Sequence, residues 1–181
     1  LSIMFTCAYI PFIAAAYETR NDLPPRWEWN ENQRYGGEMS LISAGLYYGQ
    51  YVSQYDARAC VREEAQQNTD RLLLGFNDVY AAAKLHLNVV PWNTSAQKNT
   101  QQFLSWVKKN VLTGYPVAIG VYTNEYFFYG NTDRTAGDPK YDHIVLVTGI
   151  GTNFPSSDHS YQGDDEIIFC DHGLWCEHTD P

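Results

Sequence analysis

The sequence predicts a single α+β domain, spanning residues 1–181, in which helices come first and an antiparallel sheet follows. Amphipathic stretches with helical spacing fill much of the chain from residue 37 to residue 111. Short runs rich in β-branched and aromatic residues, typical of strands, follow from residue 117 onwards. The chain shows no internal repeat or linker, and its length is sufficient for one well-buried core. Separate regions of helix and strand favour the α+β class.

The first helix is expected directly after two glycines. Gly36 and Gly37 break the chain. The apolar positions that follow repeat at helical spacing: Met39, Ile42, Leu46 and Tyr47. Further towards the N-terminus, residues 5–14 are apolar and predict a buried strand, interrupted by a proline.

Three more stretches favour helix. Residues 52–70 are polar and predict either a second helix or a helix followed by a loop, with a solvated face there: Asp56, Arg58, Arg62 and Glu63. Residues 72–87 are amphipathic, with these side chains predicted to form the buried face: Leu73, Phe76, Val79, Tyr80 and Ala83. Residues 98–111 form a further helix whose expected buried side is Phe103, Leu104, Trp106 and Val107. A Gly-Tyr-Pro sequence ends it.

Strands follow at residues 117–122, 143–150 and 166–170. Polar loops separate them, and the loop over residues 152–165 is acidic. Acidic side chains in and around these loops are oxygen donors for a cation: Asp133, Asp138, Asp158, Asp164, Asp165 and Glu166. They lack the spacing of an EF-hand, so solvated surface loops are the favoured interpretation, and cation binding is a minority alternative. No metal and no cofactor is expected.

The net charge of −9 excludes one class of partner. A strongly acidic chain repels phosphate backbones, so nucleic acid is not an expected partner. No stretch approaches the roughly 20 apolar residues that a membrane-spanning helix needs.

Four cysteines, Cys7, Cys60, Cys170 and Cys176, permit two disulfides. We expect the short loop Cys170–Cys176 and the pair Cys7–Cys60, whereas buried free thiols are the alternative in a cytosolic protein. Asn93 heads the glycosylation sequon Asn-Thr-Ser. Paired cysteines, a sequon and few charges together predict a secreted, extracellular glycoprotein.

Three positions indicate a candidate catalytic site: the glycines before the first helix, His143 and Asp171. Glycines before a helix leave backbone N–H groups free at its positive end, where enzymes place nucleophiles and oxyanion holes. A tight turn into a buried helix is the alternative interpretation. His143 begins one predicted strand and Asp171 follows the next. If the strands are neighbours, the aspartate can fix the tautomer of the histidine and support its imidazolium form.

These motifs resemble the papain-like cysteine peptidases, and within them the bacteriocin-processing, double-glycine branch. YGGEMS at residues 35–40 is similar to the family motif that opens the central helix, DHIVLVTG at residues 142–149 to the base motif, and DHG at residues 171–173 to the orienting-acid motif. The resemblance covers roughly residues 30–175. It implies a papain-like fold, with His143 as base, Asp171 as its partner, and Gln33 or Asn30 as the oxyanion-hole donor.

The departure from the family lies at Gly36, which occupies the position of the nucleophilic cysteine and has no side chain to attack a carbonyl. Neither Tyr35 nor Ser40 is well placed to replace it. We therefore expect a non-catalytic, secreted pseudo-peptidase whose former cleft, with Trp27, Trp29, Tyr35 and His143 as its lining, binds a peptide, glycan or protein partner within a larger extracellular assembly. The alternative is a hydrolase of peptide or amide bonds that uses His143 and Asp171 with an altered nucleophile.

Overall fold

The computed structural model describes residues 17–24, 26, 35–121 and 143–170. Within these ranges the chain forms β1 (Tyr17–Arg20), α1 (Gly36–Tyr47), α2 (Gln54–Ala59), α3 (Asp78–Lys84) and α4 (Thr100–Leu112). Then come β2 (Val117–Val121), β3 (His143–Thr152) and β4 (Glu166–Cys170). All strand pairs among the described residues are antiparallel and the helices lie together in the sequence, so the predicted α+β class is confirmed; the order differs from the prediction in that β1 precedes the helices.

The sheet is built around β3. Its first half pairs with β2, so that Val121 lies opposite His143, and its second half pairs with β1. β4 pairs along the other edge of β3, with Cys170 opposite Leu146. Because β3 pairs with all three of the other described strands, it determines where each of them lies in the sheet.

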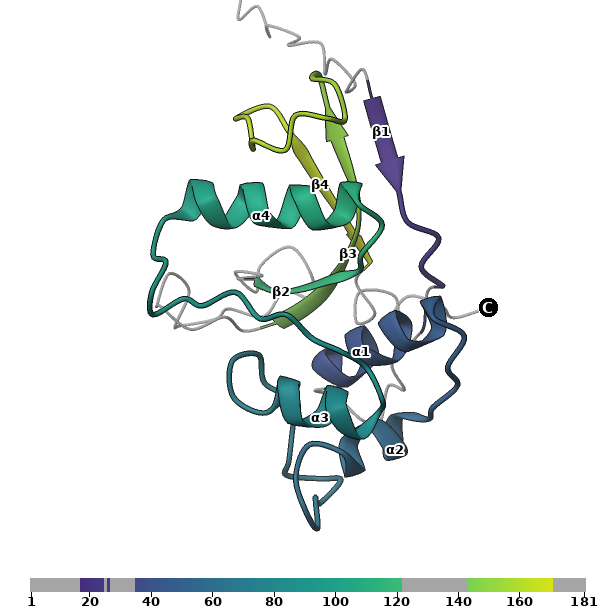
Figure 1. The fold of residues 1–181 in the computed structure, drawn as a ribbon. Helices are drawn as coiled ribbons and strands as arrows, with labels where there is room; N and C mark the ends of the chain where they lie inside the picture. The colour runs from purple at the N-terminus through teal and green to yellow at the C-terminus, as the bar shows by residue number, and fades with distance from the viewer. Residues whose placement is uncertain (1–16, 25, 27–34, 122–142, 171–181) are drawn as a thin grey trace, which may run out of the picture.

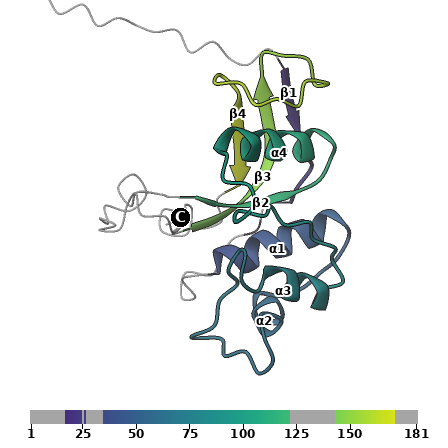
Figure 2. The ribbon, with the colours of Figure 1, turned by 60° about the vertical axis from the view of Figure 1, so that its left-hand side comes forward.

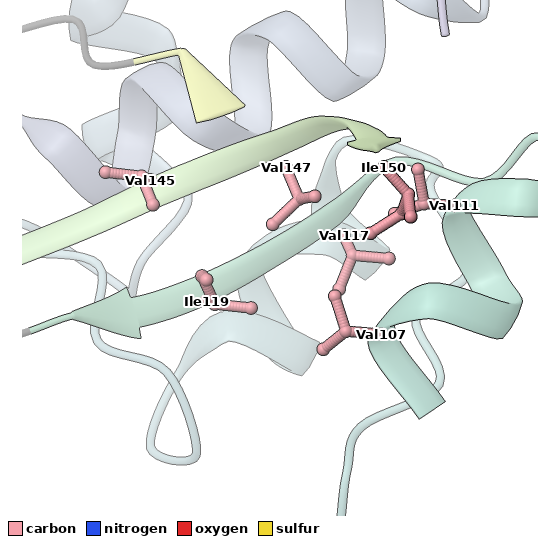
Figure 3. Close-up of a cluster of buried hydrophobic side chains, with 7 residues drawn as sticks. All are labelled: Val107, Val111, Val117, Ile119, Val145, Val147 and Ile150. Atoms are coloured by element: carbon pink, nitrogen blue, oxygen red, sulfur yellow. The ribbon is translucent and has the colours of Figure 1, made fainter. Parts of the chain in front are cut away.

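The helices form two groups, visible in both ribbon views (Figures 1 and 2). α4 crosses one part of the sheet, whereas α1, α2 and α3 gather at the other end. Nine consecutive residues of β3 are buried. Alternate side chains explain this, since Val145 and Val147 enter the core beneath α4, while Ile144 packs with Leu72 beside the other helices. Figure 3 shows the first of these cores, formed between β2, β3 and α4.

Residues 52–70 form a helix followed by a loop, which is one of the two alternatives expected, and the helix expected over residues 72–87 is shorter than predicted. The first of these helices is α2, which begins at a capping box between Ser53 and Asp56. In place of residues 72–87 there is α3, preceded by a turn in which the Leu73 N–H donates to Asn77 Oδ1. The stronger predictions were α4, β2, β3 and β4, which the structure confirms within about two residues.

The predicted buried face of residues 72–87 is wrong. Phe76 is 83% exposed and Val79 48%. Leu73, Tyr80 and Ala83 are also exposed, whereas the buried side chains of this stretch are Leu72, Ala81, Ala82 and Leu85. The helical spacing runs across the turn, where Gly75 has a φ of +76°, so the helical phase is not continuous from residue 72 to residue 84.

β1 was not predicted, and the strand expected over residues 5–14 lies outside the described residues. The sequence of β1, Tyr-Glu-Thr-Arg, is mostly exposed. It forms a strand because it pairs with the last residues of β3, from Tyr17 opposite Thr152 to Arg20 opposite Gly149. Tertiary pairing, and not local propensity, therefore accounts for this element.

Candidate functional site

Gly36 and His143, far apart in the sequence, lie in contact. Gly36 is the first residue of α1, and His143 is the first residue of β3, against which α1 packs. A Cβ atom added at Gly36 would lie 3.1 Å from His143 Cε1, 3.2 Å from His143 Nδ1 and 3.3 Å from the carbonyl oxygen of Ile144. The imidazole edge with Nδ1 therefore faces the first residue of the helix, which is the geometry that a helix-borne nucleophile and its base would need.

The neighbouring Gly37 has a different environment. A Cβ there would lie only 2.7 Å from the carbonyl oxygen of Leu72, a backbone atom that cannot swing aside as a side chain can. Gly37 is thus required for the close approach between α1 and the loop that contains Leu72. At Gly36, by contrast, two of the three nearest atoms belong to a side chain, so this position accepts a small side chain after a slight movement of His143.

Two hydroxyl groups near the helix start do not face His143. The Tyr35 hydroxyl donates to Gln67 Oε1 at 2.8 Å, and only 1% of Tyr35 is exposed, so this ring belongs to the core and does not line a cleft. Ser40 Oγ donates to the carbonyl oxygen of Gly36 at 2.9 Å, one turn back along the helix, and is equally buried. Both hydroxyl protons are therefore engaged away from the imidazole: Ser40 points elsewhere, as expected, whereas the expectation that Tyr35 lines the cleft with His143 is wrong.

Several predicted site residues fall outside the part of the chain that the structure describes: Asn30, Gln33, Asp171, Trp27 and Trp29. The oxyanion-hole donor and the cleft lining therefore stay predictions. Asp171 directly follows Cys170, the last described residue of β4, whose partner Leu146 lies three positions along β3 from His143. The pairing of Asp171 with His143 also stays a prediction.

The sequence interpretation missed a buried charged network beneath the start of α1. Arg58 was predicted to be solvated, but its side chain is 3% exposed and that of Glu38 is fully buried. Arg58 Nε donates to Glu38 Oε1, which also accepts the Leu72 N–H at 2.9 Å. Arg58 Nη1 donates to the Gln67 carbonyl at 2.6 Å, and its guanidinium lies 3.7 Å from the centre of the Tyr35 ring. A signal was present, because Glu38 stands between buried apolar positions of a helix and needs a cationic partner there.

A second buried pair corrects the cation hypothesis for the acidic loop. Asp165 Oδ2 accepts from Lys108 Nζ at 2.7 Å, and both side chains are fully buried. Lys108 Nζ also donates to Thr152 Oγ1 and to the Ser160 carbonyl, so an ammonium group from α4 already occupies the centre of these oxygens.

Asp158 and Asp164, in the same acidic loop, are bonded to neighbouring groups. Asp158 accepts the Ser160 N–H, which is the main reason that its pKa lies below the usual value, and Asp164 accepts from Asn153. Among the described residues there is no cluster of three or more potential metal-ligating side chains. Asp133 and Asp138 lie outside the described residues.

The cysteine and sequon predictions are tested only in part. Cys60 and Cys170 are half-buried, and burial is the main cause that raises the pKa of the Cys60 thiol. Their expected partners, Cys7 and Cys176, lie outside the described residues, so both pairings stay predictions. Asn93 is exposed at the start of a turn, where its Oδ1 accepts the N–H groups of Ser95 and Ala96.

The described fold and site together define an α+β domain in which a helix-opening glycine contacts a strand-opening histidine. Comparisons with known protein families, with curated proteins and with solved structures found no match for the chain. None of the described helices is long and apolar enough to cross a membrane.

Proposed function

We propose that this chain is a papain-like, cysteine-peptidase-like domain that has lost its nucleophile and binds a peptide segment without cleaving it. The observation that carries the proposal is the contact between Gly36 and the Nδ1 edge of His143. A cysteine at a helix start beside an imidazole becomes a reactive thiolate, because the helix end and the imidazolium both stabilise its charge. The chain retains the helix start and the imidazole, and it lacks the sulfur.

Without an attacking atom no acyl-enzyme can form, whereas the groups that bind and orient a peptide remain. The bound segment would belong to a partner protein, with a glycan as the other candidate ligand. A location outside the cell, in a larger assembly, fits the sequon and the cysteine count. The second candidate function, a hydrolase with an altered nucleophile, has less support, because the hydroxyls of Tyr35 and Ser40 are buried and directed elsewhere.

The decisive experiment introduces a cysteine at position 36, where the proposed nucleophile is missing. In Gly36→Cys, we expect the new thiol to have a pKa near 6, compared with about 8.5 for an ordinary cysteine. At pH 6.5 its thiolate fraction would rise from about 1% to about 75%, while its lower basicity would reduce intrinsic reactivity by roughly tenfold, leaving a net gain of several-fold. The measurement is the pH profile of the reaction with a disulfide reagent, with the modified site identified by mass spectrometry.

The matched control is Gly36→Cys combined with His143→Ala, in which the midpoint of the pH profile should return towards 8.5. An ordinary midpoint in Gly36→Cys itself would show that the resemblance is misplaced. If the natural chain cleaves peptides, and His143→Ala removes that activity, the domain is a hydrolase and the binding-only proposal fails.

The extracellular location has its own test. Because Asn93 is exposed in a turn, we expect natively purified protein to carry an N-linked glycan there, which a glycosidase that deamidates the asparagine would mark by a mass increase. An Asn93→Gln variant is the matched control. An unmodified Asn93 peptide, together with four free thiols in the intact protein, would argue against secretion.

A further inference from the structure

We propose that Arg58 is a positioning residue for the Gly36–His143 site, acting through Glu38 and through the loop that ends at Leu72. This inference rests on the proposed function, since it concerns the same site. It adds a control of the electrostatic environment of His143 by a buried ion pair that no family motif in the sequence indicates.

The network holds the chain on both sides of the two glycines. Before them, the Tyr35 ring lies against the Arg58 guanidinium and the Tyr35 hydroxyl donates to Gln67. After them, Glu38 accepts from Arg58. Arg58 also donates to the Gln67 carbonyl, so one guanidinium connects the residue before the glycines, the residue after them and the loop beneath.

The same network reaches the glycines themselves. The Leu72 N–H donates to Glu38 Oε1, and the Leu72 carbonyl is the atom closest to a Cβ added at Gly37. Gly36, one residue earlier, contacts His143. A displaced Arg58 would therefore release both the loop and the first turn of α1 from their positions relative to the imidazole.

Charge is the second part of the argument. Glu38 lies in the first turn of α1, two residues from the glycine that contacts His143, and its carboxylate is fully buried. Charges in the protein interior are poorly screened, so an unpaired carboxylate in this turn would act on the imidazole at the start of the helix and favour the imidazolium form. Arg58 neutralises that charge, so the buried pair has little net effect on His143 while both partners are present.

The other charged side chains around the site have less effect on the His143 pKa. β2 has no charged side chain, and Glu166 of β4 lies opposite Gly151, at the far end of β3 from His143. In the loop after α2, the side chains of Glu63, Glu64 and Arg71 are exposed, so water screens their charges.

Arg62 is paired with Asp70 at 2.9 Å, and the Arg62 side chain is 55% exposed, so water screens this pair. The pKa of Asp70 is lowered chiefly by the Gln66 N–H and only slightly by Arg58. Asp56 is engaged in the capping box of α2. The buried pair is therefore the main charged influence that these two elements exert on the start of α1.

The test uses the natural Gly36 chain and measures the His143 imidazole pKa by NMR titration. Arg58→Met leaves Glu38 uncompensated and should raise the His143 pKa by on the order of half a unit. Glu38→Gln, nearly the same shape, leaves Arg58 uncompensated and should lower it by a similar amount. Combining the two substitutions should return the pKa close to that of the natural chain.

Shifts of opposite sign are the result that a purely structural role would not produce. If both folded single variants leave the His143 pKa unchanged, Arg58 serves stability alone and the inference fails. If Arg58→Met does not fold, the His143 pKa in Glu38→Gln still tests the inference, because the glutamine retains an oxygen that can accept the Leu72 N–H. The outcome is independent of the Gly36→Cys experiment, because no nucleophile is needed for an imidazole to titrate.

Discussion

The two adjacent glycines should respond oppositely to the same substitution. In Gly37→Ala the added methyl group would lie 2.7 Å from the Leu72 carbonyl oxygen and 3.1 Å from Ile144 Cδ1, so the backbone at Leu72 must move by roughly half an ångström. Overpacking of this kind costs about 1–3 kcal/mol, and the Leu72 N–H bond to Glu38 would be strained in addition. The helical preference of alanine over glycine recovers about 0.5–1 kcal/mol. We expect a net loss of about 2 kcal/mol in the free energy of unfolding.

In Gly36→Ala the contacts are 3.1–3.3 Å, and two of the three nearest atoms belong to the His143 ring, which can adjust by a few tenths of an ångström. That cost, under about 1 kcal/mol, is offset by the same helical gain, so we expect stability within about 0.5 kcal/mol of the natural chain. The assay is equilibrium urea unfolding monitored by tryptophan fluorescence, with equal slopes required for the comparison. Equal destabilisation by both substitutions, or a larger loss at Gly36, would refute the proposed packing of the helix start.

Three more predictions concern buried and exposed groups. Lys108→Met should lower the free energy of urea unfolding by about 3–5 kcal/mol, because it leaves the buried Asp165 carboxylate unpaired. Adding Asp165→Leu should recover part of that loss. If it recovers nothing, the loss does not come from breaking the Lys108–Asp165 pair. Leu72→Ala should cost about 2–5 kcal/mol, whereas Phe76→Ala should change stability by less than about 0.5 kcal/mol, and the reverse order would contradict the burial of Leu72 and the exposure of Phe76 before α3. The pKa of Asp70 is lower in the folded state than in the unfolded state. Its contribution to stability is therefore present above the unfolded-state pKa and is lost as the pH falls through the folded-state pKa. Asp70→Asn should accordingly destabilise the chain at about pH 6 and not at about pH 2.

The local sequence pattern correctly predicted those helices and strands in which the spacing of apolar residues is continuous. α4 and the three later strands have uninterrupted periodic or β-branched runs, and their order was sufficient to predict the α+β class. The interpretation failed where a turn interrupts the spacing, as before α3, because helical phase cannot be carried across Gly75. It also failed where tertiary pairing overrides composition, as in β1.

For the site, the order of the motifs and their resemblance to a peptidase family together predicted that His143 faces the helix start at Gly36, and a Cβ added at Gly36 would lie 3.1 Å from His143 Cε1. Charge pairing was harder to anticipate. Arg58 lies on a polar, helix-like stretch, and only the position of Glu38 within a buried helical turn indicates that an arginine must come inward to neutralise it. The sequence therefore indicates that Glu38 needs a cationic partner, but it does not identify which of several Lys and Arg residues is that partner.

The position of His143 at the beginning of β3 has a consequence for how such a site changes over time. Three strands pair with β3 and nine of its ten residues are buried, so the backbone that carries His143 is part of the framework of the sheet. A substitution that removes a side chain at position 36 leaves those interactions untouched, because the glycine lies at the contact and not in the framework that maintains it. Under the proposed function, reactivity and architecture are separable: a single substitution at position 36 can remove the first, while the sheet still holds His143 in its place beside the helix.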